Sequence, residues 1–376
     1  MKAATPRELT HDERRVALTP DTATKLIAAK LQVAVQAGAG AGAFIPDAAY
    51  EAAGAKVLSH AADLLQDADV VLKVQAPMPS EVELLRKGSV LISFLQPATQ
   101  GDIVKALAAR GVTAFSLELL PRISRAQSMD ALSSQASAAG YKAVLMAADR
   151  IGKLFPMMMT AAGTVAPTRV LVMGAGVAGL QAIATARRLG AVVSAYDVRP
   201  AVKEEVQSLG ATFIELALET QEGEGGYAKE QSEEFLRKQR QLIGEHIAKS
   251  DVVITTAAVP GRRAPLLVTG EMVRGMRPGS VIVDLAAETG GNVELTVAGK
   301  EVDVNGVTII GTRNIPSTMA LTTSQLYARN VASLLLHLVK DGAINLDFTD
   351  DITKGSCVTH GGEIVNERAK QVVSAA

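Results

Sequence analysis

Residues 169–180 read RVLVMGAGVAGL, and this stretch decides the fold. Its apolar start predicts a buried strand, and Gly174, Gly176 and Gly179 follow with the spacing GxGxxG. A helix is predicted to begin at these glycines, and Asp197 ends the next strand, VVSAYD, about 20 residues further on. A strand, a glycine turn, a helix and an acid after the following strand are typical of a dinucleotide-binding domain.

Each residue of this motif has a predicted physical role. Gly174 permits the tight turn, Gly176 lets the backbone approach a pyrophosphate, and Gly179 lets the helix pack closely on the strand. The helix N-terminus offers unpaired N–H groups and the positive end of its dipole to the phosphates. Asp197 can accept hydrogen bonds from ribose hydroxyls and repels a 2′-phosphate, so NAD is expected rather than NADP. The nearby cation Arg199 leaves NADP as an alternative. The alternative is a doubly wound domain whose glycine turn binds no ligand.

A second glycine run, GAGAGA at 38–43, also fits the pattern after a strand. Here Phe44-Ile45-Pro46 follows directly, so no helix N-terminus faces the glycines, and the next strand, AKVLS, ends without an acid. We interpret this run as a flexible turn and expect the chain to hold one redox cofactor.

Apolar strands alternate with helical segments on both sides of a long, Ala-rich helical stretch at 129–154. This alternation predicts parallel sheets with crossover helices. The fold class is α/β, with two Rossmann-like doubly wound parallel-sheet domains joined by long helices, the second of them at 323–339. Residues 134–319 form the predicted NAD-binding domain, and residues 1–133 form the other with a returning, mostly irregular segment at 320–376. The predicted strands are LQVAVQ, DVVLKV, SVLISFL, TAFSLE, RVLVMG, VVSAYD, DVVITTA, SVIVDLA and VTIIGT.

The composition excludes several classes of function. The 376 residues carry 38 basic and 39 acidic side chains, a net charge of −1, which gives no electrostatic case for nucleic acid or an anionic membrane. Aromatic residues are 3%, so stacking on bases is not expected. The N-terminus has no apolar leader, no segment approaches the roughly 20 apolar residues that span a bilayer, and a single cysteine fits a reducing compartment. We expect a cytoplasmic protein.

Residues 219–234, ETQEGEGGYAKEQSEE, are charged and rich in glycine. One interpretation is a solvated surface loop, and the other is a mobile flap over a site, with Tyr227 as its aromatic contact.

A row of polar residues interrupts the apolar pattern within 122–137, RISRAQSMDALSSQAS. Gln127, Asp130 and Ser133 follow one another at three-residue spacing, close to one face of a short helix or turn, and Arg122 precedes them. Taken from the residues alone, the row is either a polar cap on the helix that follows or the edge of a ligand site.

Five segments together resemble one family: HDERRVALTP, VLKVQAPMPSE, MGAGVAGL, VIVDLAAETGGN and SCVTHGG. The family contains alanine dehydrogenase and the NAD(H)-binding component of proton-translocating NAD(P) transhydrogenase, and the resemblance covers essentially the whole chain. The row resembles the transhydrogenase loop that surrounds the nicotinamide, and 219–231 resembles the mobile loop of that component. The resemblance implies catalytic roles for Arg122, Gln127, Asp130 and Ser133, with Ser133 and Asp130 suited to the carboxamide and ribose. It implies cofactor contacts at these four and at Gly174, Gly176, Val177, Gly179, Asp197, Val198, Arg199, Gly226, Tyr227, Ala258 and Val259.

The resemblance also separates the two members of the family. Alanine dehydrogenase needs a histidine where this chain has Gln96, and an acid in a region where this chain has Glu288. Arg15 and Lys73, at substrate-binding positions, remain. We therefore expect NAD(H) to be held for direct hydride transfer to or from NADP(H) on a partner subunit, with an alanine dehydrogenase or a non-catalytic NAD-binding module as alternatives.

The resemblance implies further partners, whereas the expectation of no metal comes from the residues themselves. We expect membrane-spanning transhydrogenase subunits on separate polypeptides, a peripheral position on the cytoplasmic side of the inner membrane through them, and a homodimer. Cys357 and His360 are interpreted as structural, since the other histidines are scattered, and no metal is expected.

Overall fold

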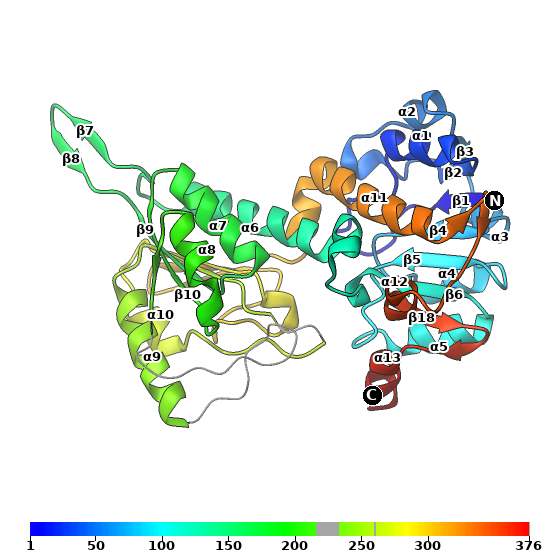
Figure 1. Cartoon of the computed structure of the whole chain (residues 1–376). Helices are drawn as coiled ribbons and strands as arrows, with labels where there is room; N and C mark the ends of the chain where they lie inside the picture. The colour runs from blue at the N-terminus through cyan, green and yellow to red at the C-terminus, as the bar shows by residue number, and fades with distance from the viewer. Residues whose placement is uncertain (216–232, 259–260, 376) are drawn as a thin grey trace. The chain divides into compact units, whose positions relative to one another are not determined.

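The computed structural model describes residues 1–215, 233–258 and 261–375, and the chain divides into two compact units (Figure 1). Unit 1 contains Met1–Gln135 and Pro316–Ala376, and unit 2 contains Ala136–Ile315. The boundaries expected from the sequence were 133/134 and 319/320.

The sheet of unit 1 has the strand order β19-β18-β6-β5-β4-β1-β2-β3. Its strands from β1 to β6 pair in parallel, with the order 3-2-1-4-5-6 that is typical of a Rossmann fold. These six strands are Lys2–Thr5, Gln32–Gln36, Lys56–Leu58, Val70–Leu72, Val90–Ser93 and Thr113–Ser116, numbered β1 to β6. The C-terminal segment adds the antiparallel β18 (Cys357–His360) and β19 (Glu363–Ile364) beside β6.

Helices cover both faces of this sheet. Along β5, Val90 and Ile92 belong to one apolar core and Leu91 to the other, because successive side chains of a strand point to opposite faces. The first core is closed by α1 (Pro20–Ala28), α2 (Asp47–Ala52) and α11 (Ala320–His337), and the second by α3 (Ala61–Gln66), α4 (Pro79–Leu84), α5 (Gly101–Arg110) and α13 (Glu367–Ala375). Continuous apolar runs such as VLIS therefore form fully buried strands.

Unit 1 differs from the prediction at both of its ends. The predicted alternation began at residue 31, whereas the central strand is β1, whose sequence KAAT has little of the β-branched and aromatic character of strands. The C-terminal tail is not mostly irregular, since it contains α12 (Asp351–Ser356), β18, β19 and α13. These elements are short, so their periodicity is too brief to be recognised from the sequence.

Unit 2 has the same order of six parallel strands as unit 1, but a different strand at the edge of its sheet. Its sheet has the order β11-β10-β9-β12-β13-β15-β14, with an antiparallel β14 (Glu301–Val304) at one edge. The parallel strands are Arg169–Met173, Val192–Tyr196, Thr212–Phe213, Val252–Thr255, Val281–Asp284 and Val307–Ile310, which are β9 to β13 and β15. The helices are α7 (Val177–Arg188), α8 (Lys203–Ser208), α9 (Glu233–Ala248) and α10 (Gly270–Arg274), together with α6 (Ala131–Arg150) from Ala136 onward. The predicted class of two Rossmann-like α/β domains is confirmed.

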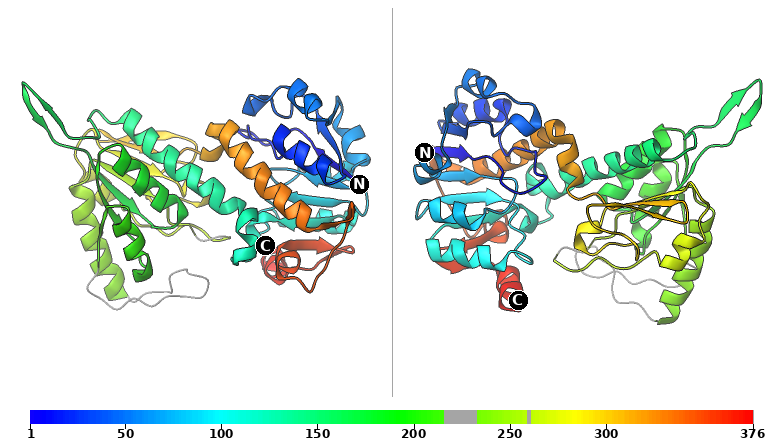
Figure 2. Two further views of the ribbon diagram at one scale, coloured as in Figure 1. Left: turned by 45° about the horizontal axis from the view of Figure 1, so that its top comes forward. Right: turned by 180° about the vertical axis from the view of Figure 1, so that it is seen from behind.

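A hairpin that the sequence did not predict follows α6. It consists of β7 (Met158–Thr160) and β8 (Gly163–Val165), pairs antiparallel, and extends away from the sheet of unit 2 (Figure 2). Its side chains Met158, Met159 and Val165 are exposed.

The second glycine run is a packed turn rather than a flexible one. It follows β2 and forms the 3-10 helix η1 (Ala41–Ala43). A Cβ on Gly40 would lie 2.6 Å from the Ile45 carbonyl oxygen, and one on Gly42 would lie 2.7 Å from the Arg14 carbonyl oxygen. These glycines are therefore required for close packing of the backbone.

Candidate functional site

The glycine turn in unit 2 has the geometry that each of its glycines was predicted to serve. Gly174 has φ +99°, a conformation that favours glycine, and a Cβ on Gly179 would lie 1.8 Å from the Gly174 carbonyl oxygen. Among the described residues, no atom lies within 4 Å of a Cβ built on Gly176, so this position is open on the side of those residues. The turn therefore has room for a ligand at Gly176, while the other two glycines are needed for the fold.

The N-terminus of α7 lies directly after this turn. Gly176 is the N-cap, and its carbonyl accepts the Leu180 amide at 2.8 Å. The first amides of an α-helix have no intrahelical partners and carry the positive end of the dipole, which suits a phosphate. Val177, the first helical residue, is 42% exposed. The residues present fit a dinucleotide pyrophosphate.

Asp197 follows β10 and is fixed by neighbours on two sides. Its Oδ2 accepts the Ala175 amide at 2.7 Å and the Arg199 guanidinium at 2.9 Å, and its Oδ1 accepts the Arg199 Nε at 2.9 Å. Burial acts to raise the pKa of Asp197, but Arg199 and the backbone amides outweigh burial and lower it. The carboxylate therefore stays charged beside the glycine turn, with Arg199 turned back onto it. Val198, between them, is partly buried.

Two polar residues that were given no role from the sequence shape the loop after β12. Asn292 accepts the Ala257 amide at 3.0 Å and donates to the Ala257 carbonyl at 2.8 Å. The fully buried Asp284, which ends β13, accepts the Asn292 amide at 2.9 Å. Thr256 donates to the Gly174 carbonyl at 3.0 Å, which links this loop to the glycine turn. The available signal in the sequence was an acidic residue, Asp284, at the end of a buried apolar strand. Ala258 is exposed in this loop.

The polar row of unit 1 spans two elements. Gln127 lies on the 3-10 helix η3 (Ser124–Met129), whereas Asp130 and Ser133 form the start of α6. Asp130 accepts the Ser133 amide at 2.9 Å and the Ser133 hydroxyl at 2.6 Å, which is helix capping. Gln127 and Arg122 are exposed, and no hydrogen bond of the Gln127 amide group is found within the described residues. Asp130 and Ser133 thus cap α6, which was the alternative interpretation of the polar row. Gln127 takes no part in this cap.

Lys73 and Arg15, the two cations at the expected substrate-binding positions, are paired with carboxylates of unit 1. Lys73 follows β4, and its Nζ lies 2.8 Å from Glu81 Oε1 and 3.2 Å from Glu8 Oε2. All three side chains are no more than 5% exposed. Burial alone would lower the pKa of Lys73, but the two carboxylates raise it. The lysine therefore remains charged.

Arg15 has a comparable environment. Its Nε and Nη2 donate to Glu13 at 2.8 and 2.7 Å, and its Nη1 donates to Gln135 at 2.8 Å. The Arg15 and Glu13 side chains are 3% and 0% exposed. A small acid bound here would have to share these donors with Glu13.

The two positions that distinguish an amino-acid dehydrogenase are Gln96 in unit 1 and Glu288 in unit 2. Gln96, just beyond β5, is exposed and donates to the Gln75 side chain at 3.3 Å. Glu288 is exposed in unit 2 and accepts the Asn314 amide at 3.0 Å. The Gln96 side chain is an amide, which does not titrate and so cannot exchange a proton with a substrate.

Three predicted cofactor residues, Gly226, Tyr227 and Val259, lie outside the described residues, as does the predicted flap at 219–231.

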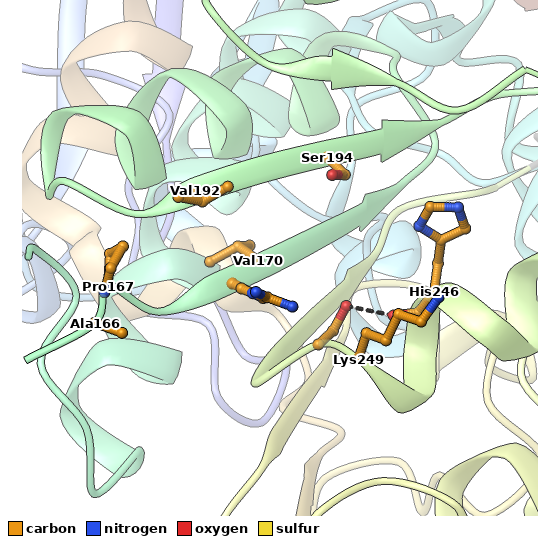
Figure 3. A pocket seen from close by; sticks show the side chains of 9 residues that line it. Ala166, Pro167, Val170, Val192, Ser194, His246 and Lys249 are labelled. Carbon is orange, nitrogen blue, oxygen red and sulfur yellow. Dashed lines mark hydrogen bonds between the residues drawn. The ribbon is translucent and has the colours of Figure 1, made fainter.

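A shallow pocket of about 340 Å³ lies elsewhere in unit 2, at the amino ends of β9 and β10 (Figure 3). Arg169, Val192, His246 and Lys249 are among its lining residues. Burial and Lys249 lower the pKa of His246. Ligands of doubly wound sheets bind at the carboxyl ends of the strands, and this pocket lies at the opposite end, so it is not the position expected for a dinucleotide.

Cys357 and His360 take part in the packing of unit 1. Cys357 is buried in β18, where burial raises its thiol pKa to about 12, and His360 contacts Thr113 Oγ1 at 3.1 Å and the Phe348 ring. Within the described ranges, no group of three or more His, Cys, Asp or Glu residues could hold a metal ion.

No helix in the part of the chain that the structure describes is long and apolar enough to cross a membrane.

Fold and site together define an α/β protein of two units with the same strand order. Unit 2 has a glycine turn with the geometry of a dinucleotide site, and unit 1 has buried ion pairs. Comparison with known proteins agrees with this class. The alanine dehydrogenase/PNT N-terminal domain matches residues 4–139, and the C-terminal domain of the same family matches residues 143–367. The chain therefore belongs to the alanine dehydrogenase/PNT family.

Three relatives refine this assignment. The chain is 51% identical to the first part of NAD(P) transhydrogenase subunit alpha in Rhodospirillum rubrum, over 97% of this chain and 98% of that protein. A transhydrogenase structure from Sinorhizobium meliloti is 47% identical with a TM-score of 0.86, covering 98% of this chain and 100% of that one. Alanine dehydrogenase of Halomonas elongata is 31% identical, over 97% of this chain and 94% of that protein. The higher identity to transhydrogenases supports the expected transhydrogenase component.

Proposed function

We propose that the chain binds NAD(H) in unit 2 and presents it for direct hydride transfer to or from NADP(H) on a partner subunit of a proton-translocating transhydrogenase. The observation that carries this proposal is the glycine turn, where Gly176 is open on the side of the described residues next to the N-terminus of α7 and Asp197 stands at the end of the next strand. The relatives named as transhydrogenase subunits support the same reaction.

The residues of unit 2 would hold the dinucleotide in a fixed orientation. The first amides of α7 would bind the pyrophosphate, and Asp197 would accept the ribose hydroxyls. The nicotinamide ring supplies the hydride chemistry when the cofactor is bound. Val198, Arg199, Ala258 and the residues Gly226, Tyr227 and Val259 are proposed as further contacts of this cofactor.

Unit 1 would supply orienting groups for the nicotinamide. We assign this role to Arg122, Gln127, Asp130 and Ser133. The Gln127 amide can donate and accept at the same time and is exposed, so it suits contact with more than one group. Direct transfer between two nicotinamides needs alignment and exclusion of water rather than a protein acid or base. Gln96, whose amide does not titrate, is compatible with such chemistry.

The partners follow from the same proposal. NADP(H) is bound by another subunit, proton movement takes place in membrane-spanning subunits, and this chain is held at the cytoplasmic side of the inner membrane by them. A homodimer is proposed as the state of the isolated chain, and sedimentation at micromolar concentration tests it.

The test has two steps. Purified chain is titrated with NADH and NADPH, and then mixed with the NADP-binding and membrane-spanning subunits to follow hydride transfer. We expect selective NADH binding by the chain alone and transfer only in the complete mixture. Equal affinity for the two cofactors contradicts the assignment of Asp197.

A parallel assay tests the alternatives. L-alanine with NAD should give no steady production of NADH, because Gln96, which stands where alanine dehydrogenase has a histidine, cannot take the proton. Sustained turnover would establish an amino-acid dehydrogenase. Binding of NADH with no transfer in the complete mixture would establish a non-catalytic NAD-binding module.

A further inference from the structure

Asn330 is a buried amide that contacts both elements carrying the polar row. It lies on α11, is 8% exposed, and is surrounded there by apolar core residues such as Tyr327 and Val331. Its Nδ2 donates to the Ser128 carbonyl of η3 at 2.9 Å, and its Oδ1 accepts the Ser134 hydroxyl of α6 at 2.7 Å. One side chain thus joins η3 to the first turn of α6.

The two contacts define the orientation of the amide group. The Ser128 carbonyl can only accept, so the nitrogen of Asn330 must face it, and the oxygen then faces the Ser134 hydroxyl. Ser128 directly follows Gln127, and Ser134 directly follows Ser133. Asn330 therefore contacts the chain immediately next to the two ends of the segment from Gln127 to Ser133.

A separate contact holds α6 alone. Gln135 donates to the Thr323 carbonyl at 3.2 Å and accepts from Arg15 at 2.8 Å, and both bonds are buried. Without Asn330, the first turn of α6 would still be attached to α11 through Gln135. The backbone of η3 would lose its bond to α11, so Gln127 would be displaced relative to Asp130 and Ser133.

We propose that Asn330 is a positioning residue for hydride transfer: it holds Gln127 at a set distance from the capped pair of Asp130 and Ser133. This inference rests on the proposed function, because the row acts only if it orients the nicotinamide. Asn330 does not touch the cofactor in this proposal and acts through the backbone of η3.

The first experiment tests the contact itself, without any activity. In Asn330→Asp both terminal atoms are acceptors, so the bond to the Ser128 carbonyl is lost and replaced by repulsion. We expect backbone amides of residues 124–130 to exchange with deuterium at least tenfold faster than in the wild-type chain. Unchanged exchange in η3 would overturn the proposal.

Asn366→Asp is the matched control. Asn366 also lies in unit 1 and donates to a backbone carbonyl, that of Gly355, at 2.9 Å, and it accepts the Ala369 amide at 3.1 Å. The same loss of one amide donor occurs there, at a carbonyl of α12 and not at one of η3 or α6. The control should leave exchange in η3 unchanged, and equal acceleration in both variants would show a general loss of stability and refute a local role.

The second experiment measures single-turnover hydride transfer in the complete complex. Asn330→Asp should slow transfer by about 10- to 100-fold, because small misplacement of orienting groups has effects of that order. The NADH dissociation constant should change less than about twofold, since a positioning effect appears in the transfer step rather than in ground-state binding. A fall in NADH affinity proportional to the fall in rate would identify a binding defect instead.

Coupling to Gln127 gives the most specific readout. Gln127→Asn keeps the amide and shortens its reach, so it should slow transfer as well. If Asn330 acts through Gln127, the double variant should be no slower than the slower single variant. Multiplied effects would show that the two residues act independently and would overturn the proposal.

Failure of the proposed function has a different signature. A wild-type complex that transfers no hydride contradicts the function, whereas wild-type transfer with an unaffected Asn330→Asp variant contradicts only the positioning role. The exchange experiment decides the contact in either case.

Discussion

The two units have the same order of six parallel strands, and they differ in the residues that come after the central strand. In unit 2, β9 leads into glycines and the N-terminus of α7. In unit 1, β1 leads into Glu8, which pairs with Lys73 beyond the neighbouring strand β4. Both places are the point where the strand order reverses, which is where ligands of doubly wound sheets bind. One topology thus supports a glycine turn whose geometry suits an anion in unit 2 and a buried ion-pair network in unit 1.

This difference shows why the second glycine run is not a nucleotide site. Gly38, Gly40 and Gly42 follow β2, which lies one strand away from the reversal of strand order. The fingerprint acts only after the central strand, because only there do the loops diverge to opposite faces and leave a crevice. The sequence pattern alone does not contain that information.

The largest effect is expected from breaking the network of unit 1. Lys73→Met leaves Glu8 and Glu81 buried without their cation, which should cost about 3–5 kcal/mol of unfolding free energy. Urea unfolding measures this loss. Lys153→Met is the matched control in unit 2, since Lys153 contacts Asp251 at 2.7 Å but is 32% exposed, and should cost about 1 kcal/mol or less. Equal costs in the two variants would contradict the difference between the units.

A pair of glycine substitutions should separate binding from folding. Gly176→Ala adds a methyl group that contacts no atom of the described residues, so stability should hold while NADH affinity falls by about tenfold or more, equivalent to roughly 1.4 kcal/mol. Gly40→Ala places its Cβ against the Ile45 carbonyl and should cost about 1–3 kcal/mol of stability with NADH affinity unchanged. Calorimetric titration and thermal unfolding of both variants test this. The reverse assignment of effects would refute the comparison.

Specificity should depend on the pair formed by Asp197 and Arg199. Asp197→Asn removes the carboxylate that binds the guanidinium and repels a 2′-phosphate, so the preference for NADH over NADPH should narrow by about tenfold. Adding Arg199→Ala should abolish the gain in NADPH affinity, because the freed guanidinium is the group that binds the phosphate. Fluorescence titration with both cofactors measures the ratio. A ratio that stays as in the wild type would exclude Asp197 as the determinant.

The smallest expected effect is on the stability of the fold at acid pH. Each unit has a carboxylate bonded to an arginine, namely Asp350 with Arg125 in unit 1 and Asp197 with Arg199 in unit 2. In unit 1, burial acts to raise the pKa of Asp350, but Arg125, the amides of α12 and His337 lower it to about 2. A carboxylate with a lowered pKa stabilises the fold above its unfolded pKa of about 3.9, and this contribution is lost as pH falls through about 2.

Asp350→Asn should therefore be less stable than the wild type at pH 7, and the difference should shrink between about pH 4 and pH 2. Unfolding midpoints across this range measure it, and Asp197→Asn should show the same sign in unit 2, where the pKa of the carboxyl is also lowered. A difference that is constant with pH would contradict the assigned cause.

Recognition from sequence worked where a pattern is local. The strand, the glycine turn and the acid of unit 2 lie within about 30 residues, and each has a steric or electrostatic requirement that few residue types meet. Long apolar runs identified most parallel strands for the same reason. The central strand β1 was missed because KAAT is short and weakly apolar, and it is a strand only because β2 and β4 pair with it on both sides.

What the sequence by itself determined is the α/β class, the glycine turn after β9 and the family, since these depend on residue type and spacing along the chain. The tertiary structure alone decided which polar groups meet. Asn330 bonds to Ser128, which lies 202 residues away in the chain, and Glu8, after β1, pairs with Lys73, after the neighbouring strand β4. Such pairs depend on strand order and helix packing, and the residue types involved have no spacing that could reveal them in advance. Asp130 and Ser133 illustrate both sides, because their three-residue spacing is local and visible, whereas the anchoring of their helix to α11 through Gln135 is not.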